Sequence, residues 1–297
     1  MAYSVIDKRE RIFIEIDTDI PKKVLILTDS RGRGLKEFIQ AKLSAIRESE
    51  HKFSARVDVY PGARIETLFI EAKNFEEIRV PDVFVFQGGI CNFTKKETIN
   101  GEEILSYYRG NQVTKFLTVI NDIRQQYGKQ ALIATVVPAC LIKYYEVCND
   151  LSPTGRLLEK LKRQQLELLE DLAYVNRNIV EGNKSVGART IDLHDKVYVS
   201  SVKKRKNKSK SRKVSKFVNE GLEDGVHPSD SLRDILNERT WDSLVRFCEH
   251  EKDVRLVLQS HQESEPESQE SDTEQWNFKR YKAPSKPSAT STSSYQS

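Results

Sequence analysis

Residues 24–35 read VLILTDSRGRGL. The four apolar residues Val24–Leu27 are too few for a helix, and a Gly-rich turn follows them, which is typical of a fully buried strand in a parallel sheet. Ser30 falls where this strand gives way to a helix that begins near Leu35. In open α/β sheets, ligands bind beyond the carboxyl ends of the strands. The sequence therefore predicts that Ser30 lies at the binding edge of a sheet.

Two interpretations of Ser30 follow from this position. A serine on a sharp turn from strand to helix can be exposed as a nucleophile, because the following glycines let the chain bend. Asp and Ser are also the ordinary residues that cap a helix N-terminus. Ser30 alone does not distinguish a nucleophile from a cap.

The rest of the chain alternates short apolar runs with amphipathic ones. Further strands are predicted at 55–60, 82–86, 131–137 and 190–193, a loop at 100–112, and helices at 35–46, from 65, at 113–123, at 154–180 and after Ser229. Parallel neighbours need crossovers that place helices on both faces of the sheet. We therefore expect a flavodoxin-like, three-layer α/β/α domain with a five-stranded parallel sheet over residues 22–250.

Composition indicates that part of the chain lies outside this domain. Only 38% of the 297 residues are hydrophobic and 31% are charged, which is low in apolar residues for a compact protein. Residues 251–297 are acidic and rich in Ser and are predicted to be a disordered tail. Residues 1–21 form an N-terminal extension, in which 12–16 alternate as in an edge strand.

A small net charge of +4 conceals one strongly basic segment. Nine of the fourteen residues 203–216 are Lys or Arg, and the segment is predicted to be a mobile loop inserted in the domain. Such a run suits contacts with nucleic-acid phosphates, a nuclear-import signal or a solvated loop. The candidate nucleic-acid contacts are Lys203, Lys204, Arg205, Lys206 and Lys208.

The four cysteines, Cys91, Cys140, Cys148 and Cys248, have no metal-ligand spacing, and no cofactor motif is present. We expect reduced thiols, no metal and no cofactor. The N-terminus lacks the pattern of a secretory signal, and no apolar run has the length of a membrane span. These features predict an intracellular protein, cytoplasmic or nuclear, that does not enter a membrane.

A second cluster of chemistry-bearing residues lies far along the chain at Asp224 and His227. At this spacing the carboxylate can orient the imidazole while the other ring nitrogen faces Ser30. Ser, Asp and His in that chain order are a known arrangement for acyl transfer. Asp192 and His194, at the end of the fifth strand, are a rival pair, and Cys91 is an alternative nucleophile.

These motifs resemble those of the SGNH/GDSL hydrolase superfamily over most of residues 22–250. Thr28-Asp29-Ser30 is similar to the first block of the family, Gly62 to the glycine of the second, and Asp224-Gly225-Val226-His227 to the last. The resemblance implies the SGNH hydrolase fold, with Ser30, Asp224 and His227 as the catalytic triad. It also implies an oxyanion hole that includes the backbone N–H groups of Ser30 and Gly62.

The third block departs from the family pattern. Where the family has Gly-x-Asn-Asp, this chain has Gly89-Ile90-Cys91-Asn92, so that Cys91 takes the place of the Asn that completes the oxyanion hole. A thiol is a weaker hydrogen-bond donor than an amide. Loss of such a donor lowers the rate on the order of 100- to 1000-fold. A shifted Asn92 is the candidate replacement.

Two arginines, Arg31 and Arg64, are predicted to lie beside the crevice, where they would bind an anionic part of a substrate or remain solvated. The sequence thus favours an SGNH-type serine esterase or deacylase that acts on a small acyl ester. The alternative is a catalytically weak protein of the same fold that binds nucleic acid through residues 203–216. SGNH-like domains also occur in proteins encoded by retroelements, and some degenerate members of the family resemble RNA-binding modules rather than esterases.

Overall fold

A computed structural model describes residues 21–47, 52–78, 80–108, 110–203 and 212–263. Its contacts divide the chain into a first unit, residues 1–256, and a second, residues 257–297. The α/β fold belongs to the first unit. The predicted extension before residue 21, the tail after 263 and the positions of Lys204, Arg205, Lys206 and Lys208 lie outside the described residues.

Five parallel strands form the central sheet, as predicted. They are β1 (Lys22–Thr28), β2 (Phe53–Val59), β3 (Val83–Gln87), β6 (Ala131–Ala134) and β7 (Thr190–Ile191). Their order is β2-β1-β3-β6-β7, and every neighbouring pair is parallel. Numbered along the sheet's own strands this is 2-1-3-4-5, the flavodoxin-like order, in which the chain reverses direction across the sheet at β1 and β3. The predicted fold class is confirmed.

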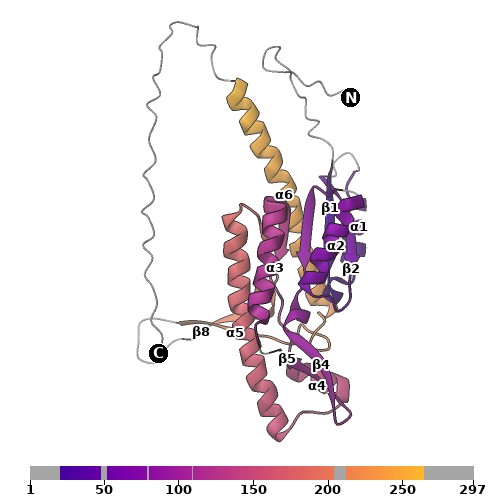
Figure 1. Ribbon diagram of the computed structural model, residues 1–297, viewed down its shortest axis with the longest axis vertical. Coiled ribbons are helices and arrows are strands. Elements are labelled where there is room, and N and C mark those ends of the chain that lie inside the picture. The colour runs from indigo at the N-terminus through magenta and orange to yellow at the C-terminus, as the bar shows by residue number, and fades with distance from the viewer. Residues whose placement is uncertain (1–20, 48–51, 79, 109, 204–211, 264–297) are drawn as a thin grey trace, which may run out of the picture. The chain divides into compact units, whose positions relative to one another are not determined.

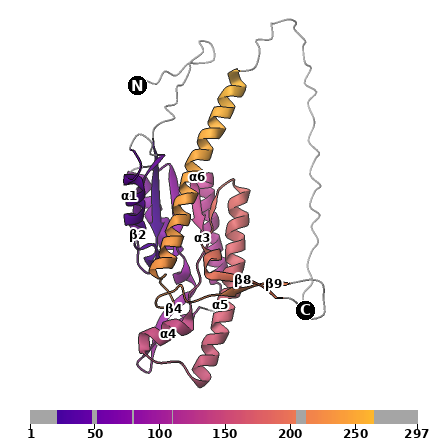
Figure 2. The same cartoon turned by 180° about the vertical axis from the view of Figure 1, so that it is seen from behind.

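Helices cover both faces of the sheet (Figures 1 and 2). Helices α2 (Ile65–Ile78), α3 (Gln112–Tyr127) and α5 (Gly155–Ser185) pack on one face. Helices α1 (Leu35–Ser44) and α6 (Asp230–Glu263) pack on the other. The apolar run of β1 explains this arrangement, because Leu25 and Leu27 enter the first core while Val24 and Ile26 enter the second.

The structure adds elements that the periodicity did not predict. Strands β4 (Thr94–Ile99) and β5 (Glu102–Tyr107) form an antiparallel hairpin where a loop was expected over 100–112. Helix α4 (Leu141–Asn149) packs beside it, and Tyr144 Oη donates to Glu103 Oε2 at 3.1 Å. The hairpin was missed because β4 has polar residues on both faces and so lacks the alternation that marks a half-buried strand.

The two ends of the basic segment, predicted as part of a mobile loop over 203–216, lie in strands, and residues 204–211 between them lie outside the described residues. Strands β8 (Tyr198–Lys203) and β9 (Arg212–Phe217) pair as an antiparallel ribbon. Aromatic residues at its base explain its formation, since the rings of Tyr198 and Phe217 lie 5.8 Å apart and both pack against the second core. Helix α6 likewise continues to Glu263, beyond the start predicted for the tail at 251.

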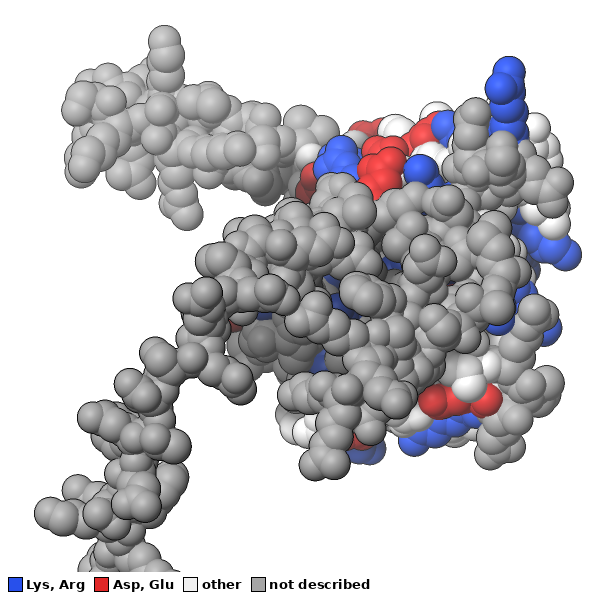
Figure 3. All heavy atoms as spheres, turned by 90° about the horizontal axis from the view of Figure 1, so that it is seen from above, with Lys and Arg blue, Asp and Glu red and all other residues white. Residues whose placement is uncertain are grey.

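Charges of both signs lie on the one face of the described residues that is seen from above. Viewed from above, Lys and Arg lie next to Asp and Glu among the described residues (Figure 3). No helix in the described ranges is long and apolar enough to span a bilayer.

Candidate active site

The nucleophile turn begins directly after β1. Residues Ser30–Gly32 form a single 3-10 turn, which Asp29 caps by accepting a hydrogen bond from the Arg31 N–H at 2.9 Å. Asp29 is almost fully buried, and burial raises the pKa of its carboxyl despite the opposing effect of Arg31. Ser30 itself is only partly buried. The turn therefore holds the Ser30 side chain at the carboxyl edge of the sheet, and the buried Asp29 side chain fixes the backbone of the turn through its hydrogen bond with the Arg31 N–H.

Asp224 organises the second half of the site by using both carboxylate oxygens. Oδ1 accepts the backbone N–H groups of Val226 and His227 at 2.9 and 2.7 Å. Oδ2 lies 2.7 Å from His227 Nδ1. One oxygen thus fixes the loop backbone, and the other fixes the orientation of the imidazole.

Gly225 lets this loop pass close to helix α4. Its φ is +82°, a left-handed conformation that residues with a Cβ rarely adopt. A Cβ at this position would lie 2.5 Å from the Cys140 carbonyl oxygen and 2.5 Å from the Tyr144 nitrogen. The Gly225 carbonyl accepts the Cys140 N–H at 2.6 Å. The loop that carries His227 is therefore clamped against α4.

Ser30, His227 and Asp224 form one hydrogen-bonded chain. His227 Nε2 lies 3.0 Å from Ser30 Oγ, although the residues are 197 positions apart in the sequence. The side chains of His227 and Asp224 are 26% and 30% exposed, so the chain lies at an accessible surface. Burial alone would raise the pKa of Asp224, but the hydrogen bonds from His227 and Val226 outweigh burial and hold this pKa below its usual value.

Gly62 lies on the turn that follows β2. The Ala63 N–H donates to the Tyr60 carbonyl at 3.0 Å, and Gly62 has a φ of +74°. Pro61 followed by a glycine at positive φ is typical of a type II turn. The sequence Pro61-Gly62 therefore fixes an exposed backbone corner beyond the carboxyl end of β2.

The Asn92 side chain is committed elsewhere, which corrects its prediction as a substitute oxyanion donor. Asn92 is buried; its Oδ1 accepts the Ile65 N–H at 2.9 Å, and its Nδ2 donates to Glu66 Oε2 at 2.7 Å. The amide thus caps the N-terminus of α2. Sequence reasoning missed Glu66, because nothing local links it to a residue 26 positions away.

Cys91 lies in the 3-10 turn Ile90–Asn92 that follows β3. Its side chain is partly buried, and burial, followed by the negative charge of Asp29, raises the pKa of the thiol. A raised pKa keeps the sulfur protonated and weakly nucleophilic. This disfavours Cys91 as an alternative nucleophile.

Arg31 is buried, in contrast to its prediction as a substrate-binding residue. Its guanidinium donates to the carbonyl oxygens of Val137 and, at 3.3 Å, Pro138. Arg31 therefore joins the nucleophile turn to the segment after β6. Arg64 is exposed, and its positive charge acts on Cys91, so it remains a candidate substrate contact.

The rival pair at the end of β7 is engaged in local contacts. Asp192 accepts a hydrogen bond from the Thr135 hydroxyl at 3.1 Å, and the His194 ring packs 4.5 Å from that of Tyr198. Burial lowers the pKa of His194. Within the described ranges, no group of three His, Cys, Asp or Glu side chains is placed to hold a metal ion.

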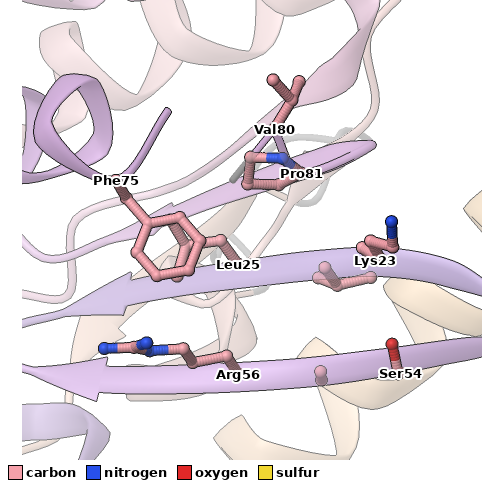
Figure 4. A pocket seen from close by; sticks show the side chains of 9 residues that line it. Lys23, Leu25, Ser54, Arg56, Phe75, Val80 and Pro81 are labelled. Carbon is pink, nitrogen blue, oxygen red and sulfur yellow. The ribbon is translucent and has the colours of Figure 1, made fainter. Parts of the chain in front are cut away.

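A hollow of about 480 Å³ lies away from the triad, at the starts of β1 and β2 (Figure 4). Phe75, Val80 and Pro81 form its apolar side, with Arg56 along β2. Because the triad gathers beyond the opposite, carboxyl ends of the strands, this hollow is separate from the candidate active site.

No protein-family model matches the chain, and no curated protein matches it. Matching solved structures include a GDSL-like lipase, a lipase/acylhydrolase and an acetyl xylan esterase. A GDSL-like lipase from Bacteroides thetaiotaomicron is 13% identical, with a TM-score of 0.45 over 76% of this chain and 88% of that one. A lipase/acylhydrolase from Enterococcus faecalis is 16% identical, with a TM-score of 0.45 over 74% and 93%. An acetyl xylan esterase is 16% identical, with a TM-score of 0.47 over 74% and 98%. Likeness at this level concerns the fold and does not transfer an activity.

Proposed function

We propose that this chain is an SGNH-type serine hydrolase that cleaves a small acyl ester. The observation that carries the proposal is the hydrogen-bonded chain from Ser30 Oγ to His227 Nε2, at 3.0 Å, and from His227 Nδ1 to Asp224, at 2.7 Å. A nucleophile within reach of a base, with a third group orienting that base, is the arrangement that acyl transfer requires.

The reaction proceeds in two halves. His227 Nε2 takes the proton of Ser30 as Oγ attacks the ester carbonyl, and the resulting imidazolium returns the proton to the departing alcohol. Water, deprotonated by the same imidazole, then attacks the acyl-serine, and Ser30 is regenerated. Asp224 holds the ring in the tautomer that has Nδ1–H and a basic Nε2.

The negative charge of the tetrahedral intermediate needs hydrogen-bond donors beside Ser30. The backbone N–H groups of Ser30 and Gly62 are assigned this role. In the sequence resemblance, the Cys91 thiol takes the position of a side-chain amide, so we expect turnover below that of a hydrolase with a complete set of donors.

Hydrolysis of a small aryl acetate by the purified full-length chain tests this proposal. We expect measurable turnover that is lost in Ser30→Ala. The matched control is Ser44→Ala, which removes a hydroxyl from an exposed position at the end of α1 and should leave the rate unchanged. Turnover that persists in Ser30→Ala would overturn the proposal.

A further inference from the structure

Two exposed basic residues border the turn that carries Cys91. Arg64 directly precedes α2, and the N–H of the next residue, Ile65, donates to Asn92 Oδ1 at 2.9 Å. Lys96 lies on β4, which begins two residues after the turn. Burial raises the pKa of the Cys91 thiol, and the positive charges of Lys96 and Arg64 are among the effects that oppose this rise. Both cations therefore lie within electrostatic reach of Cys91.

The segment that leads from β3 into this turn packs against the nucleophile turn. A Cβ at Gly88 would lie 3.0 Å from Asp29 Oδ2. The Gly89 N–H also hydrogen-bonds the Asp29 carboxylate. Asp29 directly precedes Ser30 and caps its turn. A cation within reach of Cys91 therefore lies on the side of the site where an ester would meet Ser30.

Both positive charges lack a carboxylate partner in the part of the chain that the structure describes. No ion pair between described residues includes Arg64 or Lys96. Two acidic residues of the same segments are engaged in hydrogen bonds: Glu66 Oε2 accepts a side-chain amide N–H at 2.7 Å, and Glu103 Oε2 accepts a tyrosine hydroxyl at 3.1 Å. An anionic group of a bound molecule would therefore meet two cations that no ion pair neutralises.

The two cations reach the site from different parts of the sheet edge. Lys96 Nζ lies 5.3 Å from the centre of the Tyr144 ring, on α4. The backbone of Tyr144 contacts the loop of His227, because a Cβ at Gly225 would lie 2.5 Å from the Tyr144 nitrogen. Arg64 comes instead from the loop after β2, on the other side of β1 in the strand order. The triad edge is therefore flanked by one positive charge from each direction.

We propose that the ester cleaved at Ser30 carries a negative charge, on its acyl or its alcohol half, which Arg64 and Lys96 bind. This inference rests on the proposed hydrolase and names the class of its substrate. Lys and Arg donate charge-assisted hydrogen bonds to carboxylate and phosphate, and Arg does so with two N–H groups at once. The anionic group takes no part in bond cleavage, so its binding stabilises substrate and transition state alike and lowers KM without raising kcat.

Two matched pairs of esters test the proposal and locate the charge. The compound p-nitrophenyl hydrogen adipate carries a carboxylate on its acyl half, and p-acetoxybenzoate carries one on its alcohol half. The methyl ester of each is the neutral partner. We expect the full-length chain to hydrolyse the acid of one pair with a kcat/KM roughly 20-fold above that of its methyl ester, mainly through a lower KM. Equal kcat/KM for acid and methyl ester in both pairs would overturn the inference.

Substitutions assign the preference to the two cations. Arg64→Gln and Lys96→Gln should each lower the ratio of kcat/KM for acid over methyl ester by about fivefold, with kcat for the methyl ester unchanged within about twofold. The matched control is Lys95→Gln, since neighbouring residues of a strand point to opposite faces and Lys95 is paired with Glu97 at 3.1 Å. This control should leave the ratio unchanged. A loss in Lys95→Gln equal to that in Lys96→Gln would contradict the assignment, because net charge alone would then explain the preference.

The same assay distinguishes failure of this inference from failure of the proposed function. A chain that hydrolyses none of the four esters has no hydrolase activity toward them, and both proposals are then wrong. A chain that hydrolyses all four in a reaction lost in Ser30→Ala, with no preference for either acid, is a hydrolase without an anionic substrate, and only this inference is then wrong.

Discussion

Replacing Asp224 by Asn separates the chemical role of this carboxylate from its structural role. Asn keeps an oxygen that can accept the Val226 and His227 N–H groups, now at 2.9 and 2.7 Å, so the loop should remain in place. The new amide group would face His227 Nδ1, now 2.7 Å from the carboxylate. An amide N–H there forces Nδ1 to accept, which leaves the proton on Nε2 and removes the base that faces Ser30.

We therefore expect Asp224→Asn to lower kcat for a small aryl acetate by about 10⁴-fold, the effect of fixing the wrong tautomer in a Ser-His-Asp triad, with a smaller loss of stability than Asp224→Ala. Asp224→Ala should be as inactive and should also lose about 2 kcal/mol of unfolding free energy, because two backbone N–H groups lose their acceptor. Steady-state kinetics and urea unfolding measure the two effects. If Asp224→Asn retains activity within tenfold of the wild type, the carboxylate does not orient the base and this reasoning is refuted.

Three further substitutions and one pH series test the residues around the triad. Cys91→Asn adds an amide donor next to the proposed oxyanion hole and should raise kcat by about 100-fold, with Cys91→Ser as a smaller-effect control; an unchanged kcat would place Cys91 outside the oxyanion hole. Arg31→Met leaves two buried carbonyl oxygens without a donor and should lower the free energy of unfolding, measured in urea, by about 3 kcal/mol. The control, Arg64→Gln at an exposed site, should change this free energy by less than about 0.5 kcal/mol. Equal effects of the two substitutions would contradict the buried position of Arg31. Gly225→Ala, which would place a methyl group 2.5 Å from backbone atoms of α4, should lower both Tm and kcat, and a variant with wild-type values of both would show that the loop is not clamped. The pKa of Asp224 lies below its usual 3.8 in the folded protein, so the charge of Asp224 stabilises the fold above that pH, and this contribution is lost as pH falls through the lower, folded pKa. As pH falls from about 6 to about 3, the free energy of unfolding in urea should therefore decrease less in Asp224→Asn than in the wild type. Parallel curves for the two proteins would contradict the lowered pKa.

The sheet was predictable because its strands are buried on both faces. A run such as Val24–Leu27 has no polar side, and only a parallel sheet covered by two helical layers buries it completely. The pairing of Ser30 with His227 was predicted on other grounds: Ser30 follows a strand at the carboxyl edge of the sheet, and the spacing of Asp224 and His227 lets the carboxylate orient the imidazole.

The two hairpins could not be predicted because their strands lack alternation. Strand β4 is held by pairing with β5 and by the contact of β5 with α4, and these are tertiary effects that a local pattern does not encode. The β8–β9 ribbon was hidden by its charge, because a window dominated by Lys and Arg indicates a solvated loop. Its signal lies in Tyr198 and Phe217, two aromatic residues that bracket the basic run.

The roles of Arg31 and Asn92 were missed for a different reason. Both are polar residues on loops at the site, where sequence reasoning favours contact with a ligand. Both instead satisfy backbone groups of remote segments, Arg31 at Val137 and Pro138, and Asn92 at Ile65. Such partners depend on how the segments pack and leave no local sequence signal.

Mass-spectrometric mapping of a fluorophosphonate adduct tests the central claim most directly, because this reagent reacts much faster with a serine that a neighbouring base activates than with an ordinary serine. We predict one adduct per chain, on Ser30, that is absent from His227→Ala, in which Ser30 is present but its base is removed. An unmodified chain, or an adduct on any other residue, would contradict the account of Ser30 as an activated nucleophile.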